Sequence, residues 1–396
     1  FGELYSWYLR NPEYRSRVQK LVQSAFAGKP KDIISQSVAK ALYGEVSPYS
    51  ATRLERFAAC AFAHFLQYGM KLTERVEYEF KPMDMGNVMH GALESFAEEV
   101  RKRGMKWTEL TEQERNEIAD RCLDNIVADY GNTVLKSSAR NEYMIERTRR
   151  ILRRTVWALQ KQLEQGEFQP EGFEVTFGGG RIDRVDIMED QNKVYVKVID
   201  YKTGNTSFDL VYLYHGLQLQ LMIYLDGALR VEQKKYPDKE IIPAGVFYYN
   251  IKDPMIQEKI DADVEAVSAG LMKELKMNGL VQADPELVYR MDSSLGSIPV
   301  AFNKDGSFRK NSSVADRTQF AVLGRYVRTK IEKIRSSILE GDAEVSPYEL
   351  GKKNACTYCP YMTVCGFDRR LSGYEFRRLK NFSDEELWKA FDREAE

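Results

Sequence analysis

The chain has 396 residues, and its 58 Lys and Arg residues against 59 Asp and Glu residues give a formal net charge of −1. This length is sufficient to bury a full core, in one large domain or in two to three small ones. The balanced charge excludes a globally basic nucleic-acid binder. No apolar run approaches the roughly 18 residues of a membrane span, and no signal peptide is present. We therefore expect a soluble, cytoplasmic protein with no membrane partner and, because it begins at Phe1, a fragment of a longer chain.

Residues 1–45 are predicted to be helical, because apolar side chains recur at helical spacing among Arg and Lys. We expect this segment to be a helical lead-in from an upstream region, and residues 46–396 to form one domain. Turn and helix-start chemistry at residues 46–50 then predicts a helix from Ser50 to about Leu66, with Cys60 inside it. A short strand is predicted at residues 74–80.

Three long amphipathic helices are predicted next, at residues 84–103, 111–130 and 141–165. The first contains Gly86 and His90, one turn apart on one face, so the helix could approach another element closely beside the imidazole. A lone His at such a position is more often a core or surface residue than a ligand. The third helix carries five arginines within about two turns: Arg147, Arg149, Arg150, Arg153 and Arg154. They indicate either a DNA-binding patch or a solvated helix face.

The segments 180–186 and 194–204 predict two adjacent β-branched strands joined by a polar turn at residues 189–193, and residues 173–177 predict a strand before them. Because side chains alternate along a strand, a buried run of valines on one face ends in Asp200 and Lys202. Asp183 is expected to reach the same place from the neighbouring strand. Two carboxylates and a lysine at a sheet end can hold a hard divalent cation and stabilise charge on an attacked phosphate. The alternative is an ordinary charge pair at a strand end.

Further helices are predicted at residues 209–225, 262–277, 315–339 and 383–395, with a strand at 241–250 and a small hairpin at 297–310. The first of these helices places Gln220 and Tyr224 on one face, and Ser383 and Glu386 form a capping box at the start of the last. Together the elements predict the α/β class: a central mixed sheet around residues 173–250, helices on both faces and a helical periphery.

Three of the five cysteines, Cys356, Cys359 and Cys365, have Cys-x2-Cys-x5-Cys spacing, which is typical of ligands rather than of a core. Three thiolates are too few for a closed site, so a fourth ligand must come from Cys60 or Cys122. Cys60 precedes the predicted sheet in a Phe-rich segment, whereas Cys122 lies in mid-helix and resembles a plain buried thiol. Four thiolates suit either an iron–sulfur cluster or zinc. The spacing differs from the paired Cys-x2-Cys knuckles of structural zinc sites, and this favours the cluster.

Taken together, these motifs resemble the RecB-like branch of the PD-(D/E)XK nucleases, which adds an upstream His and a downstream Gln-x-x-x-Tyr to a common Asp…Asp-x-Lys core. The matching positions are Gly86, His90, Asp183, Asp200, Tyr201, Lys202, Gln220 and Tyr224. Residues 51–65 and the terminal cysteines resemble more narrowly the C-terminal nuclease domain of the AddB subunit of bacterial AddAB helicase–nucleases. The resemblance covers about residues 46–370. It departs from the family at the short connection 178–180 and at Ala61, where a Pro is often seen.

The resemblance implies a restriction-endonuclease-like fold stapled by a 4Fe-4S cluster, whose ligands would be Cys60, Cys356, Cys359 and Cys365. It implies a metal site for Mg2+ or Mn2+ formed by His90, Asp183, Asp200 and the backbone carbonyl of Tyr201. The implied catalytic residues are Asp183, Asp200, Lys202, Gln220 and Tyr224, and DNA contacts could come from Arg149, Arg150, Arg153 and Arg154.

The implied function is that of a metal-dependent deoxyribonuclease, acting 5′→3′ on single-stranded DNA within a helicase–nuclease that processes double-strand breaks for recombinational repair. The implied partners are single-stranded DNA from unwound duplex ends and an AddA-like subunit. Two alternative functions remain: one has no catalytic activity, and the other has the same chemistry in a different cellular process. One is a catalytically inert module that guides a DNA strand, and the other is a stand-alone RecB-family or CRISPR-associated exonuclease.

Overall fold

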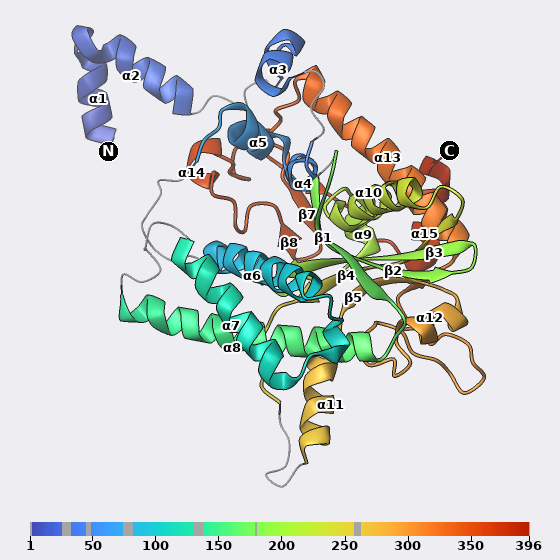
Figure 1. The fold of residues 1–396 in the computed structure, drawn as a ribbon. Coiled ribbons are helices and arrows are strands. Elements are labelled where there is room, and N and C mark those ends of the chain that lie inside the picture. The colour runs from blue at the N-terminus through green and yellow to red at the C-terminus, as the bar shows by residue number, and fades with distance from the viewer. Residues whose placement is uncertain are drawn as a thin grey trace.

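The computed structural model of the chain describes residues 2–25, 33–44, 49–73, 82–129, 138–178, 180–256 and 263–395. A six-stranded mixed sheet runs through it, with helices packed on both faces (Figure 1). In spatial order the strands are β1 Gln169–Phe177, β2 Gly180–Asp190, β3 Lys193–Lys202, β4 Glu240–Asn250, β5 Asn278–Gln282 and β6 Val314–Ala315. Strands β3 and β4 are parallel, as are β5 and β6, and the other neighbours are antiparallel. The predicted mixed sheet is confirmed, and it extends to β5 and β6, which were not predicted.

Two helical layers bury the two faces of the sheet (Figure 1). One layer contains α6 Pro82–Lys102, α7 Glu112–Asp129, α8 Ala139–Glu164 and α12 Pro285–Met291. The other contains α4 Ala51–Ala59, α9 Leu210–Tyr214, α10 Gln220–Lys235, α13 Arg317–Glu340 and α15 Asp384–Ala395. As the alternation predicts, Val196 and Val198 of β3 enter the second core, while Tyr195 and Ile199 enter the first.

The remaining elements are α1 Gly2–Arg10, α2 Pro12–Ala25, α3 Gln36–Tyr43, α5 Ala61–His64, a π-helical turn at Phe65–Gly69, a 3-10 turn at Trp107–Glu109, α11 Val264–Glu274 and α14 Met362–Cys365. A small second sheet contains β7 Tyr348–Leu350, β8 Lys353–Asn354 and β9 Arg377–Arg378. Helix α1 buries none of its residues, whereas α3 buries Ala39 and Tyr43 in the core shared with α13. In the described part of the chain, no helix is both long and apolar enough to cross a membrane.

Cys60 interrupts the helix that was predicted from Ser50 to Leu66, and its predicted position inside a helix was wrong. Helix α4 ends at Ala59, and Cys60 is extended, with φ −166° and ψ 117°. The backbone N–H of Phe62 donates to the carbonyl of Glu344 at 2.9 Å instead of to its own helix. A tertiary contact therefore overrides the helical pattern here, because it offers the backbone a partner outside the segment.

The helix predicted at residues 209–225 is also divided. Asp209 caps α9 by accepting from the backbone N–H of Val211 at 2.8 Å, but the chain then turns at Gly216, whose φ is +78°. Helix α10 begins only at Gln220. A left-handed glycine ends a helix readily because it has no Cβ to clash, and this explains the break.

Other predictions had mixed outcomes. The helices predicted at 84–103, 111–130, 141–165, 262–277 and 315–339 and the strand at 241–250 are confirmed within a few residues. The hairpin predicted at 297–310 is confirmed only in its inner part, where an isolated antiparallel bridge joins Phe302 to Phe308 and no strand forms around it. In the predicted capping box, the Ser383 N–H donates to the Glu386 carboxylate at 3.1 Å. The strand predicted at 74–80 lies outside the described residues.

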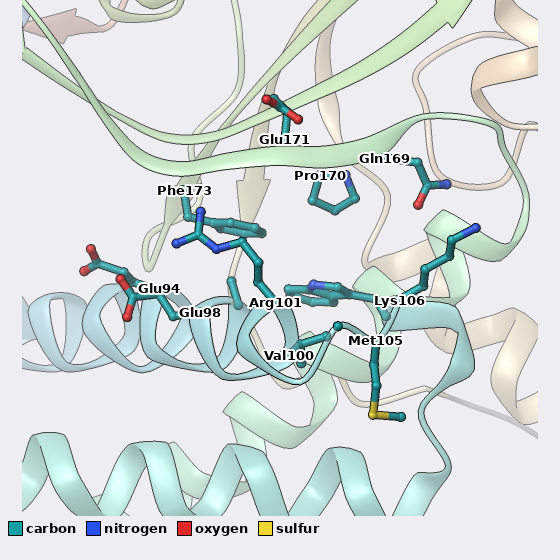
Figure 2. Close-up of a pocket in the computed structure, with 13 residues that line it drawn as sticks. Glu94, Glu98, Val100, Arg101, Met105, Lys106, Gln169, Pro170, Glu171 and Phe173 are labelled. Atoms are coloured by element: carbon teal, nitrogen blue, oxygen red, sulfur yellow. The ribbon is translucent and has the colours of Figure 1, made fainter.

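A pocket of about 270 Å3 lies between the C-terminal half of α6 and the start of β1 (Figure 2). Its walls carry three carboxylates, from Glu94, Glu98 and Glu171, against the two cations of Arg101 and Lys106. The ring of Trp107 stacks on that of Phe173 beside it, with centroids 5.8 Å apart. This pocket is therefore net acidic with one aromatic wall.

A buried ionic cluster joins β2 to β3. Arg184 donates to Asp186 through two nitrogens, at 2.5 and 2.9 Å, and Lys197 lies 3.0 Å from the same carboxylate. Their exposed fractions are 1%, 0% and 5%. Burial raises the pKa of Asp186, but the two cations outweigh it and hold this pKa below its usual value. Because Asp186 and Lys197 are directly opposite in the ladder, the cluster favours one register of the two strands.

We predict that Asp186→Ala lowers the free energy of unfolding by about 3–5 kcal/mol, because it leaves two buried cations without their carboxylate. Urea unfolding would measure this loss. The matched control is Glu385→Ala, which removes an exposed carboxylate from a surface ion pair with Lys389 and should change stability by less than about 0.5 kcal/mol. Equal stability of the two variants would contradict the structural role of the cluster.

Candidate active site

Two carboxylates converge where β2 begins and β3 ends. The ladder pairs Arg184 with Ile199, and the next residues along are Asp183 and Asp200. Asp183 accepts a hydrogen bond from the backbone N–H of Tyr201 at 2.7 Å. Their exposed fractions are 9% for Asp183 and 1% for Asp200, so the predicted strand end is less open to solvent than expected.

The charge on these carboxylates is poorly compensated by the protein alone. Burial and then the negative charge of Asp183 raise the pKa of Asp200, Lys202 acts in the opposite direction, and the net result is a pKa of about 7. The Lys202 ammonium lies 2.6 Å from Asp200. One lysine therefore faces two carboxylates, and the remaining negative charge favours binding of a proton or a cation.

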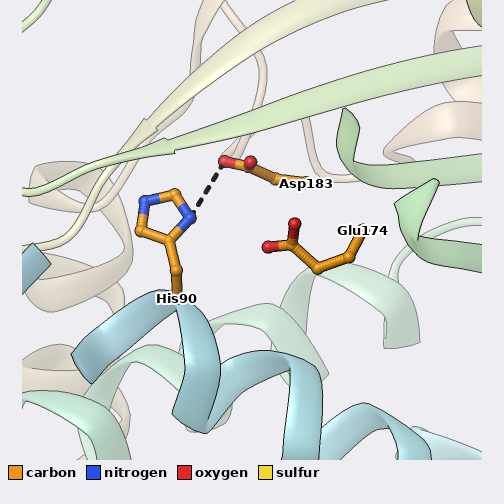
Figure 3. A group of neighbouring side chains, drawn as sticks. All are labelled: His90, Glu174 and Asp183. Carbon is orange, nitrogen blue, oxygen red and sulfur yellow. Dashed lines mark ion pairs between the residues drawn. The ribbon is translucent and has the colours of Figure 1, made fainter. Parts of the chain in front are cut away.

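His90 reaches this place from α6. Its Nδ1 lies 3.4 Å from Asp183 (Figure 3). Burial lowers the pKa of His90, but the hydrogen bond and charge of Asp183 outweigh it, so the net direction is upward. A Cβ at Gly86 would lie 3.4 Å from the hydroxyl of Thr203, the residue directly after β3. The small residue beside His90 thus faces the end of the strand that carries Asp200.

Glu174 is a site residue that the sequence patterns did not identify. One of its carboxylate oxygens lies within 4.8 Å of ligand atoms of His90 and Asp183, and Figure 3 shows the three side chains together. Burial and then Asp183 raise its pKa to about 7, whereas its ion pair with Arg181 lowers it. From the sequence, only a strand was predicted at residues 173–177. The one signal that could have identified Glu174 is an acidic side chain in the strand next to the one that carries Asp183.

Glu174 also has an unusual backbone. Its φ is +49°, a region that few non-glycine residues adopt. The ladder pairs Phe173 with Arg184 and Val175 with Ile182, so Glu174 lies between these pairs, beside Asp183. Strained backbone of this kind persists where the surrounding structure holds it, and often at functional sites.

The Gln-x-x-x-Tyr pair contacts the lysine. Lys202 donates to the side-chain oxygen of Gln220 at 2.8 Å, and the amide of Gln220 donates to the Tyr224 hydroxyl at 2.8 Å. Gln220 is the first residue of α10, and Tyr224 is one turn further on. The structure therefore brings together all the residues that were predicted for the catalytic site: Asp183, Asp200, Lys202, Gln220 and Tyr224, with His90 and Tyr201 beside them.

Glu55, from α4, anchors the start of α10 and was also missed. One carboxylate oxygen accepts from the backbone N–H groups of Leu219 and Gln220, at 2.7 and 2.9 Å. The first N–H groups of a helix have no partner within the helix, and a carboxylate is well placed to satisfy them. Burial raises the pKa of Glu55 to about 7, against the effect of these two hydrogen bonds. No sequence pattern predicts this contact, because its partners lie more than 160 residues away.

Four cysteines line a separate, apolar pocket between α5 and α14: Cys60, Cys356, Cys359 and Cys365. Burial and then the neighbouring thiols raise the pKa of Cys356 to about 12. The extended backbone of Cys60 begins α5, and N–H groups of Phe62 and Ala63 face its sulfur. Cys122 lies instead in the core of the other layer, as a buried thiol.

Three of the four predicted DNA-contact arginines on α8 are paired with carboxylates. Arg149 lies 2.7 Å from Asp124, Arg150 lies 2.7 Å from Asp253, and Arg153 pairs with Asp120. Arg154 lies over the ring of Trp157, at 5.8 Å. This arrangement fits the alternative of a solvated helix face, and a DNA-binding role for these arginines stays a prediction.

Comparison with known proteins gives both a family and relatives. The family described as the PD-(D/E)XK nuclease superfamily matches residues 48–366. The chain is 42% identical over 405 residues to the AddB subunit of the ATP-dependent helicase/deoxyribonuclease of Lachnoclostridium phytofermentans, covering 96% of this chain and 35% of the relative. It is 34% identical to the proteins of the same name from Thermoanaerobacter sp. and Alkaliphilus metalliredigens, covering 99% and 100% of this chain and 36% of each relative. The chain thus spans about a third of the length of these relatives.

We predict that Glu55→Ala lowers the free energy of unfolding by about 1–2 kcal/mol, the usual loss when a helix start is left without its acceptor. Glu55→Gln retains a side-chain oxygen that can accept from Leu219 and Gln220, so it should lose less than half as much. Urea unfolding of both variants at one pH would measure the difference. Equal losses would show that the hydrogen bonds to α10 are not what Glu55 contributes.

Proposed function

The chain belongs to the PD-(D/E)XK nuclease superfamily, as the sequence predicted, and from this premise we propose that it is a metal-dependent deoxyribonuclease. The observation that carries the proposal is the convergence of Asp183, Asp200 and Lys202 at one end of the sheet, with His90 beside them. The names of the relatives support DNA as the substrate. Because the chain spans about a third of their length, the activity of the whole protein is part of the proposal.

We assign the divalent cation to His90, Asp183, Asp200 and the backbone carbonyl of Tyr201. Carboxylate and carbonyl oxygens are the ligands that Mg2+ prefers, and an imidazole nitrogen also suits Mn2+. The donor set fits such an ion, because burial of Asp200 beside Asp183 leaves negative charge that one lysine does not balance. When bound, the cation would lower the pKa of a water ligand and offset charge on the scissile phosphate.

Lys202 supplies positive charge to the attacked phosphate in this proposal. Asp200 and Gln220 hold its ammonium from two sides, at 2.6 and 2.8 Å. Tyr224 in turn fixes the Gln220 amide, which can therefore present only its oxygen to the lysine. A charge held in place before the reaction costs no reorganisation when negative charge develops on the phosphate.

We propose that Cys60, Cys356, Cys359 and Cys365 hold a 4Fe-4S cluster with a structural role. The pocket they line fits the group in its chemistry: four sulfurs, apolar and aromatic walls, and N–H groups that face the Cys60 sulfur. Its ligands come from segments almost three hundred residues apart. Closing so long a loop constrains the unfolded chain, and binding of the cluster would be coupled to folding. Zinc is the alternative occupant.

For the whole protein we propose an exonuclease subunit that acts 5′→3′ on single-stranded DNA from unwound duplex ends, together with an AddA-like helicase–nuclease subunit, in the cytoplasm. The printed name of the relatives, which joins helicase and deoxyribonuclease, supports the pairing of the two activities. We assign the nuclease domain to residues 46–396 and the helical lead-in to residues 1–45. A catalytically inert guide for DNA is disfavoured, since the chain retains His90, Asp183, Asp200 and Lys202 together.

Asp200→Ala should lower the rate of single-stranded DNA cleavage with Mg2+ by at least about 100-fold, the scale on which loss of one charge-stabilising group acts. The thermal unfolding temperature of this variant should stay at or above that of the wild type, because a buried carboxylate with an uncompensated charge is removed. The matched control is Asp238→Ala, an exposed carboxylate between α10 and β4 that should leave cleavage unchanged. An Asp200→Ala protein that cuts at the wild-type rate would refute the assignment.

Cys60→Ala, prepared without oxygen, should lose the brown colour of the protein together with its iron, and should unfold at a lower temperature. Cys122→Ala is the matched control, because that thiol lies in the opposite core and should retain the full iron content. The visible spectrum and metal analysis of the purified proteins would separate the two. A colourless wild-type protein with one zinc ion per chain would refute the cluster and establish zinc in its place.

A further inference from the structure

A groove of about 540 Å3 runs between α10 and α13. The end of β1 forms one of its walls, at Phe177. The ring of Phe177 packs edge-to-face on Tyr224, with centroids 5.9 Å apart. Tyr224 accepts the hydrogen bond of Gln220, which holds Lys202. The groove is therefore separated from the catalytic lysine by the Tyr224–Gln220 pair.

The rim of this groove is strongly cationic. Four basic side chains line it, from Arg230, Lys234, Arg328 and Arg335, against the single carboxylate of Asp226. Asp226 pairs with both Arg230 and Arg328, at 2.7 and 2.9 Å, and so holds two guanidinium groups together over the groove. The side chains of Arg230, Lys234 and Arg328 are exposed. Arg335 also pairs with Glu332 of α13, at 3.0 Å. Two carboxylates thus face four cations, and the groove keeps a net positive charge.

The floor of the groove is apolar. It is formed by Met222, Ile223 and Val231 from α10 and by Val327 and Ile331 from α13. A cationic rim over an apolar floor suits a flexible polyanion whose phosphates lie at the rim and whose bases lie on the floor. A volume of this size is that of a site for one small ligand, which admits a short stretch of one strand and not a duplex.

The two other charged surfaces near the helical layers fit such a strand less well. Arg149, Arg150 and Arg153 of α8 are each paired with a carboxylate, and Arg154 lies over Trp157. The pocket between α6 and β1 in Figure 2 has more carboxylates than cations, although Glu94 lies one turn from His90. Among the pockets of the described residues, the α10–α13 groove has a net positive charge and a lysine without an ion pair, Lys234, and it touches the site through the contact of Phe177 with Tyr224.

We propose that the α10–α13 groove, and not the arginine face of α8, binds the single strand of DNA that leads to the active site. The proposal rests on the nuclease function proposed above and assigns the path of its substrate. Phosphates would contact Arg230, Lys234 and Arg328, and the bases would lie against the apolar floor. The strand would pass Phe177, which packs on Tyr224, on its way to the reacting phosphate.

The test compares three variants of the protein that each remove cationic groups. The groove variant is Arg230→Gln, Lys234→Gln and Arg328→Gln together. The α8 variant is Arg150→Gln with Arg154→Gln. The charge-matched control is Lys304→Gln, Lys380→Gln and Lys389→Gln together, three exposed lysines from other elements. Binding of a fluorescent 30-nucleotide strand would be measured by anisotropy in EDTA, at several salt concentrations.

The groove variant should bind the strand on the order of tenfold more weakly, and its salt slope should fall by about 2, since each lost phosphate contact on a single strand removes about 0.7. With Mg2+, its KM for the strand should rise while kcat stays within about twofold. Hydrolysis of bis(p-nitrophenyl) phosphate, which is too short to extend from the active site into the groove, should be unchanged. The α8 variant and the lysine control should bind like the wild type.

Lys234→Gln alone gives a second measurement, because Lys234 has no ion pair among the described residues and its loss should not disturb the fold. Its salt slope should fall by about 0.7. Wild-type binding by the groove variant, or weakened binding by the α8 variant alone, would overturn the proposed path while leaving the nuclease function intact. A wild type that binds through the groove but cuts neither DNA nor the small diester would refute the proposed function and leave the path standing.

Discussion

The active site depends on the register between β2 and β3. The side-chain period of a strand is 2, so a slip of one residue would move Asp183 to the opposite face of the sheet. Asp186 and Lys197 are directly opposite in this ladder, and with Arg184 they form a buried cluster in which both cations contact the carboxylate only in this register. A slipped pairing would bury these charges apart from one another, at a cost of several kcal/mol. The cluster thus fixes the catalytic carboxylate from three residues away.

The balance of charge is reversed at the active site, where β2 begins and β3 ends. Asp186 has two cations and a lowered pKa, whereas Asp200 has one lysine, a neighbouring carboxylate and a pKa raised to about 7. Glu174, also with a pKa of about 7, adds a third carboxylate and is held there by a backbone conformation with φ +49°. The fold thus has an excess of cations around Asp186 and an excess of carboxylates around Asp200, and only the second place favours binding of a cation. The uncompensated end is where we place the divalent metal.

Much of this was predictable because it depends on local patterns. Alternation along residues 194–202 places Asp200 and Lys202 on one face, and helical spacing pairs Gln220 with Tyr224. The features that the sequence patterns missed, the conformation of Cys60 and the role of Glu55, depend on distant partners. Cys60 is extended because the loop at Glu344 takes the N–H of Phe62, and Glu55 matters only because Leu219 and Gln220 lie against it in the fold. Strands β5 and β6 were missed because they are short. Five and two residues carry little periodic signal on their own.

Helix α4 connects the cysteine pocket to the catalytic lysine. Glu55 lies in the middle of α4, and Cys60 directly follows the last residue of this helix. Glu55 holds the backbone of Gln220, and Cys60 lines the pocket of the three C-terminal cysteines. The C-terminal segment is attached there as well, because Arg377 donates to the carbonyl of Ala58 and Tyr361 to that of Leu72.

Such an arrangement leaves little freedom for α4 to move. The hydrogen bonds from Leu219 and Gln220 to Glu55 are 2.7 and 2.9 Å long. A shift of α4 by about 1 Å directly away from α10 would carry both beyond hydrogen-bonding range. Gln220 would then lose its backbone anchor, and the ammonium that it orients would lose one of its two fixed neighbours. The proposed cluster would therefore act on the reaction only by holding α4 in place, because Glu55 of this helix anchors Gln220, which in turn holds Lys202.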